Sequence, residues 1–437
     1  MDIYVVQPND NIYSIAEKFG VSAQKIIIDN ELSTPTNLVT GQALVITYPK
    51  QTHVVQPADT IDSIAATYNV SQMQILRNNP FLANYKLNPG ETIIISYNTT
   101  GQITTNGFVY PYISLDTLKK TLPNLTYITI YNYRIIKEGE IISYFDDTDV
   151  IQISKDYDTI PLLMISTLSL QGEPDMDTAY SILSNDTYQY NTIANILNVV
   201  KTKGYAGINI VFNYIKINVK DNYQNFITKL ENEILAKGYL LFVTINPHIK
   251  SDNNIIVFEE IDYSFISENV TNMSFIQFIW GINYGPPLPV NSIKNIHTFM
   301  HYVIATVSPD KVTIGKSLVS YDWALPYVPG KSTANALSIN SALNLARDTG
   351  AVIQFDDVSQ TPFFIYKLKT NATEVQHIVW TIDARSVSAL IDLIAEFELN
   401  GCIFWNLMLY FPQLWLVINT QYEVEKIIQE KPTDISN

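Results

Sequence analysis

The chain has 437 residues, of which 47% are hydrophobic, and a formal net charge of −15. This length allows about two to four folded domains, and the negative charge argues against nucleic acid and against anionic membrane surfaces as partners. Cys402 is the single cysteine, so no disulfide can form within the chain. No apolar run reaches the roughly 18 residues that span a bilayer. The first residues lack the basic and apolar regions of a signal peptide, so we expect synthesis in the cytoplasm without one.

The N-terminal part contains an internal repeat. The segment Tyr-Val-Val-Gln-Pro-Asn-Asp at 4–10 returns as His-Val-Val-Gln-Pro-Ala-Asp at 53–59. Such self-similarity indicates two copies of one supersecondary unit. We therefore expect two small domains, at residues 1–48 and 49–97.

Each copy changes its hydrophobic period twice. In the first copy, residues 3–7 alternate as a strand, and residues 11–18 and 22–29 have helical spacing. A second strand follows Gly41, so the unit is predicted to be βααβ. A serine that can cap the second helix precedes it in each copy: Ser22 and Ser71.

Residues 98–437 form a third domain in which short apolar runs alternate with helical stretches. Eight strands separated by helices are typical of a (β/α)8 barrel. Residues 351–384 predict a small antiparallel insertion before the last strand, so the fold class is α/β with a small α+β insertion. The expected barrel strands are 107–111, 126–132, 161–166, 207–213, 239–246, 274–280, 312–318 and 401–406, and the expected helices include 114–122, 190–203, 222–237, 292–306 and 386–398.

The fourth of these strands should carry the chemistry. Side chains alternate along a strand, and the active sites of such barrels lie at the carboxyl ends of the strands. The outward face is apolar, as a face covered by helices must be. The expected inward residues are Asn209, Val211 and Asn213, and the outward ones are Ile208, Ile210 and Phe212.

The repeat resembles the LysM module in its Val-Val-Gln-Pro-x-Asp opening and its Leu-x-x-Gly close. The resemblance implies binding of N-acetylglucosamine-containing glycans such as peptidoglycan or chitin by the loops around 8–13 with 30–36, and 57–62 with 79–85. A docking platform without glycan binding is the alternative. The residues expected to bind glycan are Asp10, Asn11, Asn30, Asp59, Thr60 and Asn79.

The segment Gly-Tyr-Ala-Gly-Ile-Asn-Ile-Val-Phe-Asn-Tyr at 204–214 is similar to the catalytic strand of family 18 glycoside hydrolases. Together with Trp-Gly-Ile-Asn-Tyr-Gly-Pro-Pro at 280–287 and Phe-Trp-Asn-Leu at 404–407, it resembles the spore cortex-lytic subgroup. The resemblance implies that a Glu at position 213 protonates the leaving oxygen and that an Asp at position 211 orients the N-acetyl group of the substrate. The positions that depart from this pattern are Ala206, Asn209, Val211, Asn213 and Phe278.

The chain keeps aromatic residues that the family uses around its cleft, although the acids of the family are absent. The resemblance places Trp405 under a sugar ring, which can stack on its face. No cofactor and no metal are expected, and His297 and His301 are interpreted as a surface pair on one helix face. The residues expected around the cleft are Trp405, Trp280, Tyr284, Tyr321, Trp323 and Tyr214.

Because an amide cannot act as a general acid at neutral pH, the favoured hypothesis is a non-enzymatic protein on a spore coat or cortex surface. It would bind peptidoglycan or another N-acetylglucosamine polymer through a catalytically inactive barrel. One alternative is an active N-acetylglucosaminidase of cortex peptidoglycan that uses displaced acids, with Asp356 and Asp357 as candidates. Another is a structural protein that self-associates in a spore layer.

Overall fold

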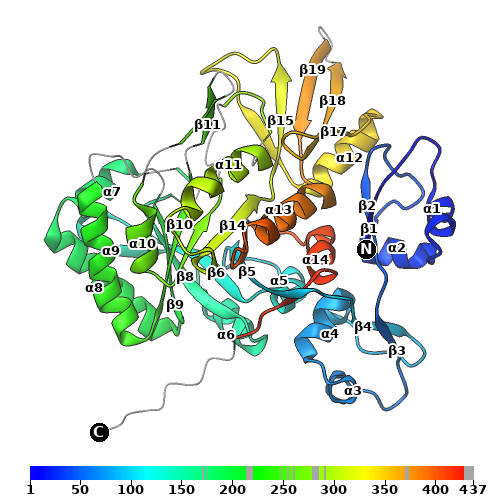
Figure 1. Ribbon diagram of the computed structural model, residues 1–437, viewed down its shortest axis with the longest axis horizontal. Coiled ribbons are helices and arrows are strands. Elements are labelled where there is room, and N and C mark those ends of the chain that lie inside the picture. The colour runs from blue at the N-terminus through cyan, green and yellow to red at the C-terminus, as the bar shows by residue number, and fades with distance from the viewer. Residues whose placement is uncertain are drawn as a thin grey trace.

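The computed structural model describes residues 1–427 except 170–171, 174, 213–219, 248, 253–254, 259–260, 278–284, 290–291 and 370–373. Within this described part of the chain, no helix is both long enough and apolar enough to cross a membrane. Figure 1 shows two small modules beside a large barrel, with an additional sheet above the barrel.

Each N-terminal module is a two-stranded antiparallel sheet with two helices, as the repeat predicts. Ser22 and Ser71 cap the second helices by accepting hydrogen bonds from Lys25 N and Gln74 N. Module 1 contains β1 (Asp2–Val5), α1 (Ile12–Phe19), α2 (Ala23–Asp29) and β2 (Ala43–Ile46), and module 2 contains β3 (Gln51–Val54), α3 (Ile61–Tyr68), α4 (Gln72–Asn78) and β4 (Thr92–Ser96).

Among the described residues, eight parallel strands close into a barrel. The order is β5, β6, β8, β9, β10, β13, β14 and β20, and β20 pairs with β5 to complete the circle. All eight expected strands are confirmed in order, although β5 begins six residues before the expected 107, and the ends expected at 213 and 278–280 lie outside the described residues. Their bounds are β5 (Gly101–Val109), β6 (Tyr127–Ile135), β8 (Ile160–Ser166), β9 (Gly207–Phe212), β10 (Leu240–Ile245), β13 (Asn272–Phe275), β14 (Val312–Ser317) and β20 (Gly401–Trp405).

Helices cover the outside of the barrel and bury its outward apolar side chains in one large core. Ile208 and Ile210 belong to this core, as the alternation on β9 predicts. The short strand β7 (Ile141–Ser143) pairs with β6, and β21 (Tyr422–Val424) pairs with β5. The helices are α5 (Leu115–Thr121), α6 (Thr148–Asp156), α7 (Met176–Leu183), α8 (Asp186–Lys203), α9 (Lys220–Ile234), α10 (Tyr263–Glu268), α11 (Ile293–Ile304), α13 (Ala384–Glu396) and α14 (Pro412–Asn419).

The insertion is larger than the sequence predicts. It begins at β15, three residues after β14 ends, and not at residue 351. Its first strand, β15, pairs with β19 far along the chain, and local sequence patterns do not report such distant pairing. The sheet has the order β16 (Ala334–Leu337), β15 (Ser320–Leu325), β19 (Glu374–Trp380), β18 (Thr361–Lys369) and β17 (Gln354–Asp356), and α12 (Ile339–Thr349) packs on it.

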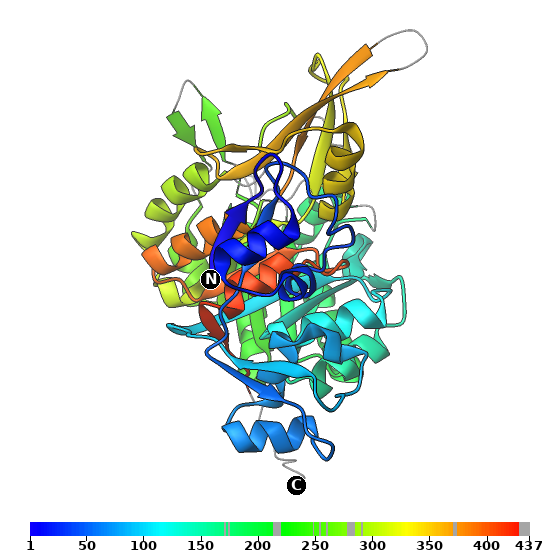
Figure 2. The same cartoon turned by 90° about the vertical axis from the view of Figure 1, so that its right-hand side faces the viewer.

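Module 1 is docked against the barrel and the insertion. Figure 2 shows it lying over α13 and α14, with module 2 below it. Arg385 Nη2 donates to Gly41 O at 3.3 Å, and Ile353 N donates to Thr40 O at 3.0 Å. A Cβ atom on Gly41 would lie 1.8 Å from Ile353 O, so the backbones approach too closely for any side chain.

Replacing Gly41 by Ala tests this docking. Gly90 is the matched control, because it holds the same place in module 2 with a φ of 89° against 87°, but a Cβ there meets nothing within 4 Å. We expect Gly90→Ala to lower the free energy of unfolding by about 1 kcal/mol through its left-handed backbone. Gly41→Ala should cost about 1–3 kcal/mol more because it also clashes. Urea and thermal unfolding measure both, and equal effects would contradict the docking.

Candidate functional site

The inner face of β9 holds a buried amide inside a small polar network. Asn209 is fully buried, and its Oδ1 accepts a hydrogen bond from Thr244 Oγ1 at 2.9 Å. Its Nδ2 donates to Thr129 Oγ1 at 3.3 Å, and that hydroxyl donates to Asn106 Oδ1 at 3.1 Å. Asn209 therefore links β5, β6, β9 and β10 across the barrel interior.

Val211 lies further along the same face and is 1% exposed. It belongs to a second apolar cluster inside the barrel, toward the carboxyl ends of the strands. An aliphatic side chain fits these surroundings, whereas an unpaired carboxylate there would carry a large desolvation cost. The cluster consists of Phe108, Tyr131, Met164, Leu168, Val211, Ile276, Ile403 and Trp405, with Tyr110 packed against it.

Trp405 ends the last barrel strand and is 5% exposed. Its ring centroid lies 5.2 Å from that of Phe108, 6.0 Å from that of Tyr110 and 6.2 Å from that of Tyr131. The indole is thus held by rings from the first two barrel strands and the segment after β5. Its role as the floor under a sugar stays a prediction.

An aromatic strip that was not predicted from the sequence leads from Trp405 to the surface. Tyr110 and Tyr112 stack at 5.2 Å and 24°, and Phe145 meets Tyr112 edge-on at 5.1 Å. Burial raises the pKa of Tyr110 and of Tyr112. Tyr112 is 57% exposed and Phe145 is 40% exposed, so both offer ring surface to a ligand. The sequence feature that could have indicated this strip is Tyr-Pro-Tyr at 110–112, directly after β5, because barrel enzymes carry their sites at the carboxyl ends of the strands.

Tyr321 and Trp323 are buried on one face of the insertion sheet, each 3% exposed. Tyr321 pairs with Trp380 in the β15–β19 register, and Trp380 Nε1 donates to Pro287 O at 2.9 Å. Tyr321 and Trp323 lie on the face of the sheet opposite Asp322, whose carboxylate accepts from Tyr366 OH, and their place around the cleft stays a prediction. The other expected residues Asn213, Tyr214, Phe278, Trp280 and Tyr284 lie outside the described residues, and Ala206 is half-buried just before β9.

The two candidate displaced acids lie where β17 turns into β18: Asp356 ends β17, and Asp357 is the first residue of the turn. Asp356 Oδ2 accepts a hydrogen bond from Ser359 N at 2.9 Å, and Asp357 is exposed. Ser359 O in turn accepts from Ile293 N at 3.2 Å, at the first residue of α11. Helices that follow barrel strands begin on the side of the strands' carboxyl ends. The turn therefore lies on the same side of the barrel as the aromatic strip.

In the modules, the two expected aspartates stabilise the loop after the first strand. Asp10 Oδ2 accepts from Tyr4 OH at 2.6 Å and from Gln7 N at 2.7 Å. The hydrogen bond to Asp10 raises the pKa of Tyr4 to about 12. Asp59 occupies the same place in module 2, and its Oδ2 lies 2.7 Å from His53 Nε2. The residues that follow these aspartates form helix N-caps: Asn11 and Thr60.

Asn30 and Asn79 join each second helix to its last strand. Asn30 Nδ2 donates to Ile26 O at 3.1 Å and to Val45 O at 2.8 Å, and its Oδ1 accepts from Val45 N at 2.8 Å. Asn79 makes the same two-way bond with Ile94. Both side chains are buried, and Asn30 Oδ1 also accepts from Gln413 Nε2 of α14 at 3.4 Å.

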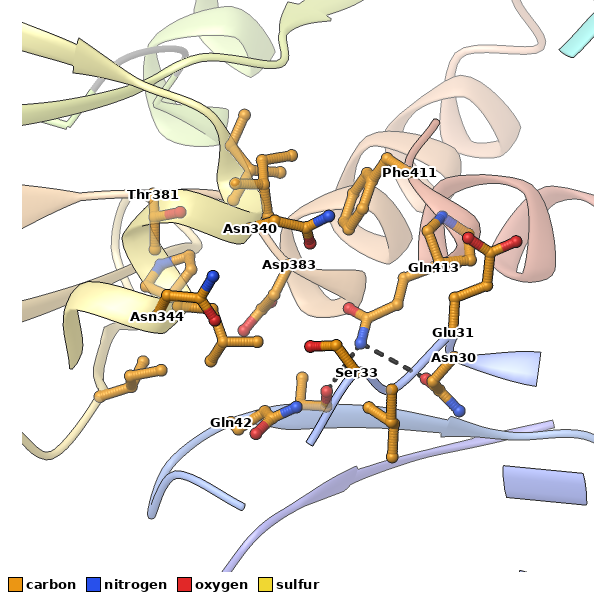
Figure 3. A pocket seen from close by; sticks show the side chains of 18 of the residues that line it. Asn30, Glu31, Ser33, Gln42, Asn340, Asn344, Thr381, Asp383, Phe411 and Gln413 are labelled. Carbon is orange, nitrogen blue, oxygen red and sulfur yellow. Dashed lines mark hydrogen bonds between the residues drawn. The ribbon is translucent and has the colours of Figure 1, made fainter. Parts of the chain in front are cut away.

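The loop after α2 faces the barrel across a cavity of about 320 Å³. Figure 3 shows Ser33 of this loop facing Asn340 and Asn344 of α12, with Gln413 beside them. Gln413 Nε2 donates to Ala43 O at 2.7 Å. A second cavity of about 630 Å³ lies between α14 and both modules and is lined by the loop after α4. Of the loops expected to bind glycan, those at 30–36 and 79–85 thus open into these cavities, whereas those at 8–13 and 57–62 line neither of them.

Comparison with known proteins decides the family. Residues 93–409 match the domain described as Glycosyl hydrolases family 18, and residues 4–47 and 53–96 match the LysM domain. The chain belongs to glycosyl hydrolases family 18. This family 18 chain is 35% identical over 432 residues to a cortical fragment-lytic enzyme of Bacillus subtilis (strain 168), covering 98% of this chain and 99% of the relative.

Solved structures agree with this assignment to family 18. The crystal structure of the spore cortex-lytic enzyme SleL of Bacillus megaterium QM B1551 matches with a TM-score of 0.77 at 30% identity, over 98% of this chain and 99% of that one. The Bacillus cereus spore cortex-lytic enzyme SleL matches with a TM-score of 0.77 at 28% identity, over 97% and 99%. The LysM and family 18 domains imply binding of peptidoglycan or other N-acetylglucosamine polymers.

These relatives overturn the expectation of a catalytically inactive binding protein. Proteins similar along the whole chain are named as lytic enzymes, which favours the alternative of an active hydrolase. The expectation rested on the joint departures at Val211, Asn213 and Phe278, and it favoured loss of catalysis over the alternative of displaced acids at Asp356 or Asp357. A cleft at the end of a barrel is formed by loops from several strands, so a carboxylate on another element can reach it.

Replacing Tyr112 by Ala tests the aromatic strip. The change removes an exposed ring that stacks on Tyr110, and we expect affinity for N-acetylglucosamine oligomers to fall roughly tenfold. Tyr112→Phe keeps the ring and should bind within about twofold of the wild type. Isothermal titration calorimetry measures both variants, and equal affinity of Tyr112→Ala and wild type would exclude the strip from binding.

Proposed function

We propose that this chain is a hydrolase that cleaves N-acetylglucosaminidic bonds in spore-cortex peptidoglycan fragments. The observation that carries the proposal is the 35% identity to a cortical fragment-lytic enzyme over 98% of the chain. The shared arrangement of two LysM modules and a family 18 barrel supports it. The location that we propose for the protein is the spore.

The proton donor in this proposal is a carboxylate outside β9. Asn213 stands where the family carries its acid, and an amide holds no proton to give at neutral pH. Asp356 and Asp357 are the proposed source, because their turn contacts the first residue of α11 on the side of the aromatic strip. Asp357 is the more available of the two, since Asp356 already accepts a bond from Ser359 N.

The substrate would bind in two places. The aromatic strip of Tyr110, Tyr112 and Phe145 gives sugar rings a stacking surface beside Trp405. The modules would hold more distant parts of the same polymer through the loops that open into the two cavities. Binding at linked sites raises the effective concentration of substrate at the barrel.

Release of soluble muropeptides from purified cortex fragments tests the function. We expect the wild type to release them and Asp357→Asn or Asp356→Asn to lower the rate by about 10²–10⁴-fold, the contribution of a general acid. Asp348→Asn is the control, because it removes an exposed carboxylate from α12 of the same insertion. No release by the wild type would contradict the function, and full activity of both variants would place the acid elsewhere.

A further inference from the structure

Two histidines and one glutamate meet on the outer surface of the barrel, away from the site described above. His297 and His301 lie on α11, and Glu396 is the last residue of α13. The two helices pack side by side (Figure 1). The sequence predicted the shared helix face of the histidines but not Glu396, which lies about a hundred positions along the chain and reaches them only through the fold.

The potential ligand atoms of the three side chains all lie within 4.8 Å of one another. His297 Nε2 is 2.9 Å from Glu396 Oε1, and the two imidazole centroids are 4.7 Å apart. Residues four apart on a helix face the same direction, so both rings point toward the carboxylate. The ring of Phe397 packs against both imidazoles, at 5.3 and 4.9 Å, and limits their orientations.

We propose that His297, His301 and Glu396 form a binding site for a divalent transition metal ion, with Zn²⁺ as the best fit. Imidazole nitrogen and carboxylate oxygen bind Zn²⁺ at about 2.0–2.2 Å. Ligands at such lengths around a tetrahedral ion are about 3.3–3.6 Å apart. The outermost atoms must therefore move by about 1 Å, which exposed side chains do by small rotations.

The donor set also selects among ions. Two imidazoles and one carboxylate suit Zn²⁺, Cu²⁺, Ni²⁺ or Co²⁺, whereas Mg²⁺ and Ca²⁺ prefer oxygen ligands. The side chains of His297 and Glu396 are 38% and 53% exposed, so an ion can enter from solvent and water can complete its coordination. The net charge of −15 favours cations near the surface.

The position of the site indicates a structural role. Glu396 ends α13 just before β20 begins at Gly401, and His301 lies in the last turn of α11. These helix ends lie toward the amino ends of the barrel strands, opposite the side where barrel enzymes carry out chemistry. A bound ion would join α11 to α13 and replace the exposed contact between His297 and Glu396, which by itself contributes little.

Zn²⁺ titration of chelator-treated protein without a histidine tag tests the site. We expect calorimetry to show one saturable Zn²⁺ site per chain, and Co²⁺ to give the visible absorption of a coordinated ion. Loss of even an outer partner of a metal ligand costs about 10–100-fold in affinity. His297→Ala, His301→Ala and Glu396→Gln should therefore each weaken binding at least about tenfold.

The matched control is His53→Tyr in module 2. It removes another histidine that contacts a carboxylate and installs the residue that module 1 carries at the corresponding place, Tyr4. This variant should bind Zn²⁺ like the wild type. Binding that survives in all three site variants, or that disappears in the control, would overturn the proposal, as would the absence of saturable binding.

Thermal unfolding tests the link between the helices. An ion that binds the folded state raises the melting temperature, so Zn²⁺ should raise it for the wild type and for His53→Tyr. The same Zn²⁺ concentration should leave the melting temperatures of His301→Ala and Glu396→Gln unchanged. These positions are exposed, so the variants are expected to fold without the ion. An unchanged melting temperature of the wild type at saturating Zn²⁺ would overturn the structural role.

Discussion

The structure depends on the closure of the barrel by β20. This strand pairs in parallel with β14 on one side and with β5 on the other, which joins the end of the domain to its beginning. The approach is close enough that a Cβ atom on Gly401 would lie 2.0 Å from Thr104 O. The flanking elements carry the other features: Trp405 ends the strand, α13 before it brings Arg385 to module 1, and Gln413 of α14 holds the same module.

Much of this architecture was predictable because it follows from local patterns. The eight barrel strands are short apolar runs between helices, and the two modules repeat one another with only small changes. Ser22 and Ser71 were predicted as helix caps because a cap acts on the residues that directly follow it. The inward direction of Asn209 and Val211 follows from the period of a strand.

Contacts between distant elements were not predictable in this way. The sequence singled out Asn30 and Asn79 for glycan, but the fold uses their amides to join helix and strand inside each module. The role of Gln413 in holding module 1 was not predicted, because its partner Ala43 lies at the other end of the chain. The judgement on catalysis failed for a related reason. Val211 was correctly placed in the barrel, but one strand does not tell which side chains of other segments reach the end of the barrel.

The central claim is that this barrel hydrolyses cortex glycan, although position 213 holds an amide. The most direct measurement is mass spectrometry of cortex fragments that have been incubated with the protein in ¹⁸O-labelled water. Hydrolysis places the oxygen of water on the anomeric carbon of the released sugar. The account predicts muropeptides that carry one ¹⁸O atom at a new N-acetylglucosamine reducing end. Fragments that bind the protein and are recovered at their original size without label would contradict it.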